Sequence, residues 1–165
     1  MKIELHAIQY SASASQETAF FSADLHIEGV RVGTVSNGGT GGGDTFHGDR
    51  AAYAAADAWC RVKLPPWRSQ DDQEFETDLE LYCAFLLQRW IDAGDLRRAM
   101  EERVLWRDSS DGRVYEVRHR GAVEETVATV RQRYPDATIL NELPFAMALA
   151  IYERVPPDRD EGQAP

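Results

Sequence analysis

The chain has 165 residues, a formal net charge of -10, 43% hydrophobic residues and 28% charged residues. This length suits one domain with a single core, and the apolar content excludes a disordered chain. The acidic charge argues against direct binding to nucleic-acid backbones, because phosphate contacts need clustered lysine and arginine. A basic protein partner is compatible with it.

The N-terminus alternates apolar and polar residues, whereas a signal peptide needs a continuous apolar run, and no other stretch has the length of a membrane span. Cys60 and Cys83 have neither the spacing of a metal site nor a disulfide-dense pattern. Each falls in a predicted helix among apolar neighbours. We therefore expect two small core residues and a cytoplasmic protein without membrane attachment.

Hydrophobic alternation over residues 2–7 and 21–27 predicts two strands that each expose one polar face. Glu28-Gly29 follows, and its glycine permits a tight two-residue turn into a third strand over residues 30–35. The first 37 residues are therefore predicted to form a three-stranded antiparallel meander. The apolar side of its first strand is expected to hold Ile3, Leu5 and Ala7.

Two helices are predicted for the middle of the chain. Asp49 is a suitable N-cap for the first, over residues 50–63. The second has Ser69, Asp71 or Asp72 as its cap and Gly94 as its stop, and a short helix is expected over residues 95–102. One apolar stripe at helical spacing marks the second helix: Phe75, Leu79, Tyr82, Cys83, Leu86, Trp90 and Ile91.

The C-terminal part predicts a second hairpin, over residues 104–107 and 114–119, and then a helix, a short strand and a last helix. The helices are expected from Val123 to before Pro135 and from Pro144 to about Arg154, with the strand at residues 138–140. The fold class is therefore α+β: an N-terminal three-stranded antiparallel meander, central helices, a second β-hairpin and C-terminal helices in one compact domain over residues 1–155. Residues 156–165 are expected to be a frayed tail. Whether the two hairpins join one sheet stays open.

Residues 36–49 hold six glycines and are either a ligand loop or a connection. They lack the lysine and hydroxyl of a phosphate-binding loop, and Asp44 stands where a dinucleotide-binding pattern needs its third glycine. The candidate ligand-binding residues are Asp44, Thr45, His47 and Asp49. Of these, Asp44, His47 and Asp49 could surround a cation together with the backbone carbonyls of Gly42 or Gly43. A flexible crossover is the favoured interpretation, and docking on a partner protein is the third. No resident metal or cofactor is predicted.

A second candidate cluster lies on the predicted meander. His6 and His26 fall on the polar faces of strands that can pair, near Glu4 and Asp24. The register decides whether they meet, and exposed polar alternation is also the ordinary outer face of an antiparallel sheet. No nucleophile-elbow pattern occurs, so no catalytic residue is assigned and catalysis is not favoured.

Two segments suit a protein partner. Trp67 and Arg68 follow two prolines, so the aromatic ring either covers the core or stands exposed as an anchor. Residues 103–133 hold seven arginines against five acids, and three of these arginines gather at the second hairpin: Arg113, Arg118 and Arg120. A row of acids at the start of the second helix could instead imitate a nucleic-acid backbone: Asp71, Asp72, Glu74, Glu76, Asp78 and Glu80.

The expected function is a noncatalytic protein-interaction or regulatory module. The alternatives are a metal- or small-ligand-dependent enzyme built on residues 36–49 and an acidic inhibitor that mimics nucleic acid. The meander, the glycine-rich joint and the pattern YP-x(4)-LN-x-LP from Tyr134 to Pro144 resemble small hypothetical proteins of bacteria and phages. This resemblance implies a prokaryotic, intracellular accessory protein and carries over no activity.

Overall fold

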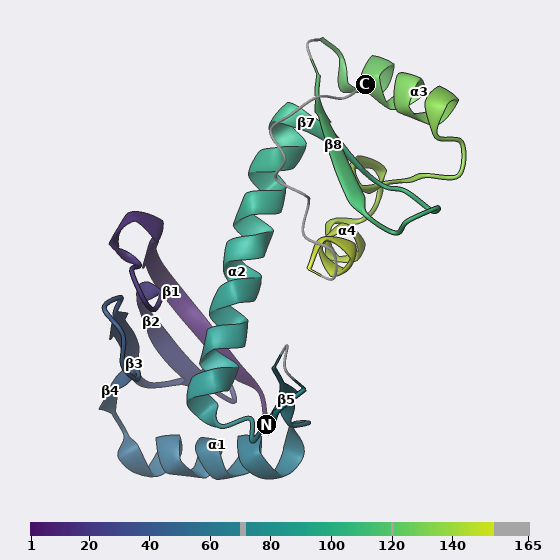
Figure 1. Cartoon of the computed structure of the whole chain (residues 1–165). Helices are drawn as coiled ribbons and strands as arrows, with labels where there is room; N and C mark the ends of the chain where they lie inside the picture. The colour runs from purple at the N-terminus through teal and green to yellow at the C-terminus, as the bar shows by residue number, and fades with distance from the viewer. Residues whose placement is uncertain (70–71, 120, 154–165) are drawn as a thin grey trace. The chain divides into compact units, whose positions relative to one another are not determined.

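The computed structural model of the chain describes residues 1–69, 72–119 and 121–153 (Figure 1). Its elements fall into two compact units that divide between Gln88 and Arg89. Both units combine helices with antiparallel strands, which confirms the predicted α+β class, whereas one domain over residues 1–155 stays a prediction. Residues 156–165, the predicted tail, lie outside the described residues. Within the described part of the chain, no helix is both long and apolar enough to cross a lipid bilayer.

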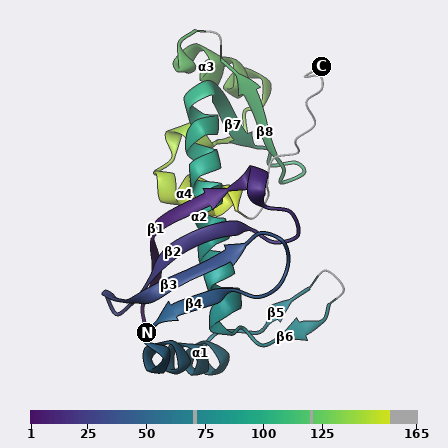
Figure 2. The same cartoon turned by 90° about the vertical axis from the view of Figure 1, so that its left-hand side faces the viewer.

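The first unit is built on one antiparallel sheet with the strand order β1-β2-β3-β4 (Figure 2). Its strands are β1 (Ile3–Ser11), β2 (Phe20–Ile27), β3 (Val30–Gly38) and β4 (Thr45–Gly48). The meander of β1 to β3 confirms the sequence prediction. The fourth strand corrects it, because the second half of the glycine-rich stretch pairs with β3 and is not loop.

The turn between β2 and β3 follows the prediction. Ile27 pairs with Val30 around Glu28 and Gly29, whose φ angles are 50° and 79°. Two positive φ angles in succession match the right-handed twist of the flanking strands, and glycine adopts one of them without steric cost. The two-residue hairpin is therefore confirmed.

Strand β1 departs from simple alternation at Ala7. This residue has a φ of 49° and is exposed, and the register with β2 shifts between His6 and Gln9. The expectation that Ala7 shares the buried face with Ile3 is wrong, because a bulge inserts an extra residue and changes the phase of the strand. Beyond the bulge Tyr10 pairs with Phe21.

Helix α1 (Arg50–Lys63) has the predicted limits, and Asp49 is its N-cap. One carboxylate oxygen of Asp49 accepts from the backbone N–H groups of Ala51 and Ala52, at 2.9 and 3.1 Å. These bonds satisfy two donors that the first turn of a helix leaves without partners.

A small hairpin follows α1 in place of the predicted helix start. Strands β5 (Trp67–Arg68) and β6 (Glu74–Phe75) pair with each other in a two-stranded sheet. Helix α2 (Leu79–Glu102) begins only after them, where the Asp78 carboxylate accepts from the backbone N–H of Leu81 at 2.8 Å.

Helix α2 also continues past its predicted stop. Gly94 lies inside the helix, which runs on to Glu102, so the separate short helix is wrong. A glycine inside a helix costs roughly 1 kcal/mol relative to alanine, and the complete burial of Leu96 in the turn after it offsets this cost. Phe75 and Trp90, expected on the buried stripe, are 46% and 47% exposed.

The core of the first unit lies on one face of its sheet, across which the first turns of α2 run (Figures 1 and 2). The hydrogen bond from the Leu79 backbone N–H to the Asp57 carboxylate, 2.9 Å long, ties the start of α2 to α1. The buried side chains of this core come from β1 to β3, α1 and α2: Ile3, Phe21, Ala23, Leu25, Val35, Ala56, Cys60, Leu79, Cys83 and Leu87.

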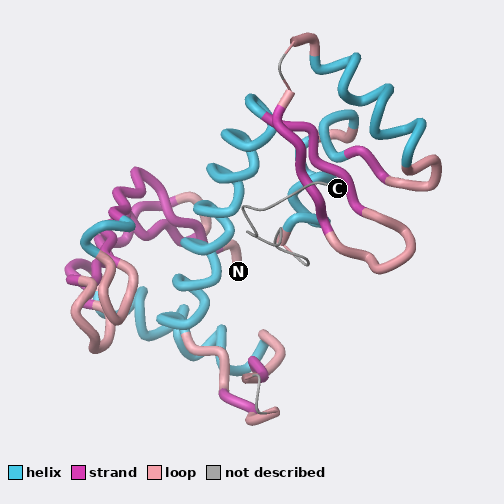
Figure 3. The backbone as a smooth tube through the Cα atoms, turned by 45° about the horizontal axis from the view of Figure 1, so that its top comes forward, coloured by secondary structure: helices cyan, strands magenta, loops and turns pink. Residues whose placement is uncertain are grey.

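The second unit contains the end of α2 and a three-stranded sheet with the order β8-β7-β9 (Figure 3). Its strands are β7 (Arg103–Arg107), β8 (Val114–Arg118) and β9 (Thr138–Ile139). Helices α3 (Val123–Arg133) and α4 (Phe145–Tyr152) lie close to their predicted positions. The two predicted hairpins therefore belong to separate sheets.

Alternate residues of β7 face two different clusters of buried side chains. Leu105 packs in a cluster that includes Leu149 of α4. Val104 and Trp106 pack in the other, together with Val127 of α3. The period of two along a strand thus places α3 and α4 on opposite faces of this sheet, with β7 in its middle.

Candidate functional site

The six residues after β3, here called the glycine loop (residues 39–44), are organised around Asn37. Its amide oxygen accepts from the backbone N–H of Gly39 at 2.9 Å and from the Thr18 hydroxyl at 2.6 Å. Its amide nitrogen donates to the carbonyl oxygen of Gly42 at 3.2 Å and to the Asp44 carboxylate at 3.0 Å. Asn37 is only 9% exposed, so these hydrogen bonds take the place of those that its amide would make to water.

Gly39 joins the glycine loop to the connection between β1 and β2. Its carbonyl oxygen accepts from the backbone N–H groups of Gln16 and Glu17, at 2.8 and 3.1 Å. Its φ is 77°, and a β-carbon there would stand 2.5 Å from the carbonyl oxygen of Ala14. These contacts hold the glycine loop against the β1–β2 connection, and the flexible crossover stays a prediction.

Asp44 lies at the end of the glycine loop against the start of α2. Burial raises the pKa of its carboxyl group, the hydrogen bond from Asn37 lowers it, and the nearby Glu80 raises it further. The Asp44 backbone N–H donates to the Glu80 carboxylate at 3.0 Å. A surface pocket of about 520 Å³ adjoins this point, and burial raises the pKa of Tyr53 in its wall to about 12. The pocket is lined by Asp44, Thr45, Phe46, Arg50, Tyr53 and Ala54.

The four candidate ligand residues of this stretch do not converge. Asp44 and Thr45 share the pocket wall, but Asp49 is engaged as the helix cap. His47 is exposed and lies opposite Thr34 in the register of β3 and β4. In the ranges that the structure describes, no three histidine, cysteine, aspartate or glutamate side chains are arranged to hold a metal ion.

The second candidate cluster is brought together by the register of β1 and β2. Glu4 pairs with His26 and His6 pairs with Asp24, and the two imidazole rings lie 4.1 Å apart between centroids. The ion pair with Arg31, 2.8 Å long, lowers the pKa of Asp24. The predicted cross-strand neighbours are therefore real neighbours on the polar face of the sheet.

Both cysteines are core residues, as the sequence predicted. Cys60 is 0% exposed and Cys83 is 1% exposed. Burial raises the pKa of the two thiols, to about 11 for Cys60 and to about 12 for Cys83. Thiols with such pKa values stay protonated at neutral pH, which is the opposite of what a cysteine nucleophile needs.

Trp67 stands at the surface and does not cover the core. It is 41% exposed, and its ring contacts Phe75 of the paired strand at 5.6 Å between centroids. Arg68 makes ion pairs with Asp72 and Glu74. The β5–β6 hairpin therefore presents one aromatic pair and a neutralised arginine.

The predicted row of acids does not line a helix. Only Glu80 falls in the first turn of α2, because the helix begins at Leu79. Glu76 and Asp78 both pair with Arg61 of α1, at 3.0 and 3.4 Å. Asp71 lies outside the described residues. The arginine partners neutralise several of these carboxylates, which weakens the resemblance to a phosphate backbone.

The arginines of the second hairpin also separate. Arg113 lies at the turn, where its backbone N–H donates to the Asp111 carboxylate at 2.9 Å. Arg118 lies at the other end of β8 and pairs with Glu102 at 3.1 Å. Arg120 is outside the described residues. Of this predicted set, Arg118 borders a surface pocket of the second unit.

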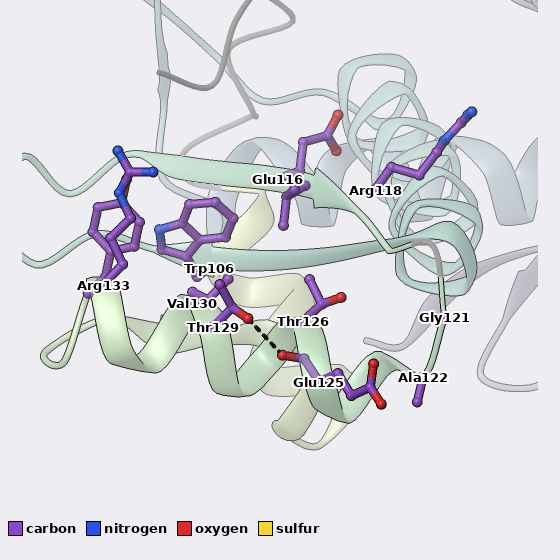
Figure 4. Close-up of a pocket in the computed structure, with 12 residues that line it drawn as sticks. Trp106, Glu116, Arg118, Gly121, Ala122, Glu125, Thr126, Thr129, Val130 and Arg133 are labelled. Atoms are coloured by element: carbon purple, nitrogen blue, oxygen red, sulfur yellow. Dashed lines mark hydrogen bonds between the residues drawn. The ribbon is translucent and has the colours of Figure 1, made fainter.

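That feature, here called the β8–α3 pocket, has a volume of about 550 Å³ and lies between strand β8 and helix α3 (Figure 4). Trp106 forms part of its wall and stacks between Tyr115 and Tyr134, at 5.9 and 5.4 Å between ring centroids. The complete lining is Trp106, Glu116, Val117, Arg118, Gly121, Ala122, Glu125, Thr126, Thr129, Val130, Arg133 and Tyr134.

The indole N–H of Trp106 is the anomaly of this pocket. The side chain is buried, with 7% of the residue exposed, yet Nε1 has no hydrogen-bond partner among the described residues. Buried indole groups usually find an acceptor, and leaving one unsatisfied costs about 1 to 3 kcal/mol. In Figure 4 the nitrogen edge of the ring points toward the end of the pocket where Arg133 lies.

Sequence reasoning did not find this pocket. The available signals were Trp106 within the predicted hairpin and Tyr134 within the YP pattern, but neither carries a chemical motif. Their contact depends on α3 folding back over β7, which alternation and capping do not specify. Comparisons of the chain with protein-family models, curated proteins and solved structures give no match.

Proposed function

We propose that the protein is a noncatalytic interaction module whose second unit binds a partner segment in the β8–α3 pocket. The observation that carries this proposal is the buried, unpartnered Nε1 of Trp106 in the pocket wall. A partner that brings a hydrogen-bond acceptor to this N–H would relieve the desolvation penalty of the free protein.

The composition of the lining favours binding over catalysis. The described residues that line the pocket include no histidine, cysteine or serine. The Thr129 hydroxyl donates to the backbone carbonyl of Glu125 at 3.0 Å, and the Glu116 carboxylate is paired with Arg103. No nucleophile therefore has a base beside it, as covalent catalysis requires. Aromatic rings, apolar side chains and a few polar groups are the usual lining of a recognition site.

The direct test is selection of peptides on the immobilised full-length chain from a displayed library of random peptides about twelve residues long. Peptides that are enriched are synthesised, and their dissociation constants are measured by titration calorimetry. Thr126 is half-buried in the pocket wall, so Thr126→Trp should fill the pocket and weaken binding at least about tenfold.

The matched control is Ala128→Trp. Ala128 is exposed on the same helix and does not line the pocket. This variant should bind the enriched peptides within about twofold of the unchanged protein. The proposal fails if no peptide is enriched over bare support, or if Thr126→Trp binds as well as Ala128→Trp.

A further inference from the structure

Strand β8 is an edge strand in the sheet of the second unit. Among the described residues it pairs with β7 alone. Such an edge leaves a row of backbone N–H and C=O groups without ladder partners, and extended peptides bind proteins by adding to it.

The hydrogen-bond pattern identifies which residues have backbone groups on the outer edge. The Asp108 backbone N–H donates to the Arg113 carbonyl at 2.9 Å, and the His119 N–H donates to the Glu102 carbonyl at 3.2 Å. In an antiparallel pair every second residue is bonded inward to its partner strand. Three residues of β8 are therefore directed outward through their backbone: Val114, Glu116 and Arg118.

Two of these residues border the β8–α3 pocket. Glu116 and Arg118 belong to its lining, although Figure 4 shows both side chains pointing away from α3. The part of β8 that borders the pocket at these residues is therefore the backbone edge. An occupant lying along the pocket would have the free edge of a sheet beside it and the aromatic wall of Trp106 and Tyr134 beneath it.

We infer that the ligand of the β8–α3 pocket is an extended peptide that pairs with β8 as an additional strand and carries a basic residue about four positions before an acidic one. This inference rests on the proposed function and names the class of partner. It combines the outward backbone groups of β8, the unpartnered N–H of Trp106 and the charges at the two ends of α3.

The charge requirement follows from Glu125 and Arg133, which lie at opposite ends of the pocket (Figure 4). They are eight positions apart on α3, which is about 12 Å along a helix. An extended chain covers this distance in about four residues, and residues four positions apart in a strand point to the same side. A basic side chain at Glu125 and an acidic one at Arg133 would complement both ends.

The direction of the peptide follows from the neighbouring elements. Trp106 pairs with Tyr115 and stacks on Tyr134, so the end of α3 lies near the start of β8. Helix α3 thus runs opposite to β8, and a peptide antiparallel to β8 runs in the direction of α3. Antiparallel pairing is the more frequent kind, and it places the basic residue first. The acidic side chain then lies at the Arg133 end of the pocket, toward which the nitrogen edge of Trp106 points (Figure 4).

The test uses synthetic peptides of about nine residues with blocked termini, in which arginine precedes aspartate by four positions in a threonine- and valine-rich background. The matched peptides have a spacing of three positions, or the same spacing with aspartate first. The first peptide should bind the full-length protein at least about tenfold more tightly than either control. Equal binding of all three overturns the charge arrangement.

Strand addition itself is tested by N-methylation of each peptide bond in turn. Methylation should weaken binding about tenfold at every second position, where the N–H faces β8, and much less at the positions between. If methylation weakens binding equally at every position, and Thr126→Trp still weakens binding of the same peptide, strand addition is overturned. The proposed function stands in that case. Failure of the random library to yield any binder overturns both.

The contribution of Arg133 is tested without disturbing the core. Arg133→Glu should weaken the binding of the arginine-aspartate peptide at least about fivefold. Replacing the peptide aspartate with lysine should restore the binding to this variant. Because the rescue compares two peptides on one variant, a general loss of stability cannot produce it. Absence of the rescue overturns the placement of the acidic residue at this end.

Discussion

The glycine loop and the β8–α3 pocket differ in the way their polar groups are satisfied. In the loop, Asn37 alone makes four hydrogen bonds, two through its amide oxygen and two through its amide nitrogen. In the pocket, the buried Nε1 of Trp106 makes none within the described residues. The polar groups of the glycine loop are thus satisfied within the first unit, whereas the pocket contains a buried donor that the described residues leave unsatisfied.

The largest expected effect is on the glycine loop. Asn37→Ala should lower the free energy of unfolding by about 3 kcal/mol, because it removes four hydrogen bonds and leaves buried donors without partners. Urea denaturation measures this change. Ser36→Ala, at the neighbouring half-buried position, should cost less than about 1 kcal/mol. A loss as small as that of the control would mean that the loop network does not hold the fold.

The backbone of the same loop gives a second, smaller effect. Gly39→Ala should cost about 2 kcal/mol, because alanine is strained at a φ of 77° and its β-carbon meets the Ala14 carbonyl oxygen. Gly38→Ala is the matched control, since a β-carbon at Gly38 has nothing within 4 Å. If both variants unfold at the same urea concentration, the close approach of the loop to the β1–β2 connection is not needed for stability.

How far the sequence predicted these regions depends on the range of the interactions. Helix α1 was predicted with its limits because Asp49 and the following turn contact each other along the chain. The turn at Glu28 and Gly29 is local in the same sense. Strand β4 was missed because its partner β3 lies across the glycine loop, and its four residues are too few to establish a period of two.

The candidate site was less predictable than the fold. Residues 36–49 drew attention through composition, yet what decides their role is Asn37, whose partners include Thr18 on another connection. Trp106 and Tyr134 are ordinary core aromatics in sequence. The proposed function depends on one missing hydrogen bond and on a strand edge that is unpaired among the described residues, and both are properties of the folded second unit.

In the pocket, unlike in the loop, removing the buried polar group should cost little free energy of unfolding. Trp106→Phe should change the free energy of unfolding by about 1 kcal/mol or less, because the lost apolar area is offset by removal of an unsatisfied donor. Leu105→Ala, at the fully buried neighbouring position on the other face of β7, should cost about 3 kcal/mol. A comparable loss in both variants, measured by denaturation, would show that the Trp106 N–H is not a cost to the free protein.

The smallest effect, which tests the glycine loop by its dependence on pH, concerns Asp44. Burial, together with Glu80, raises the pKa of its carboxyl group above the ordinary 3.8, so the folded state binds this proton more tightly than the unfolded state. The contribution of Asp44 to stability is then complete below pH 3.8 and is lost as the pH rises through the raised pKa.

Asp44→Asn keeps an acceptor for the Asn37 amide and stays neutral, so its stability relative to the unchanged protein should rise as the pH increases above 3.8. Asp24→Asn is the control of opposite sign. The pKa of Asp24 is lowered by Arg31, and its contribution to stability is therefore present above pH 3.8 and lost on acidification. Denaturation curves that start below pH 3.8 should show Asp24→Asn losing stability relative to the unchanged protein as the pH rises toward 3.8, and Asp44→Asn gaining it as the pH rises above 3.8. Parallel curves would mean that the loop carboxylate is not desolvated in solution, which would reopen the glycine loop as a site that awaits a cation.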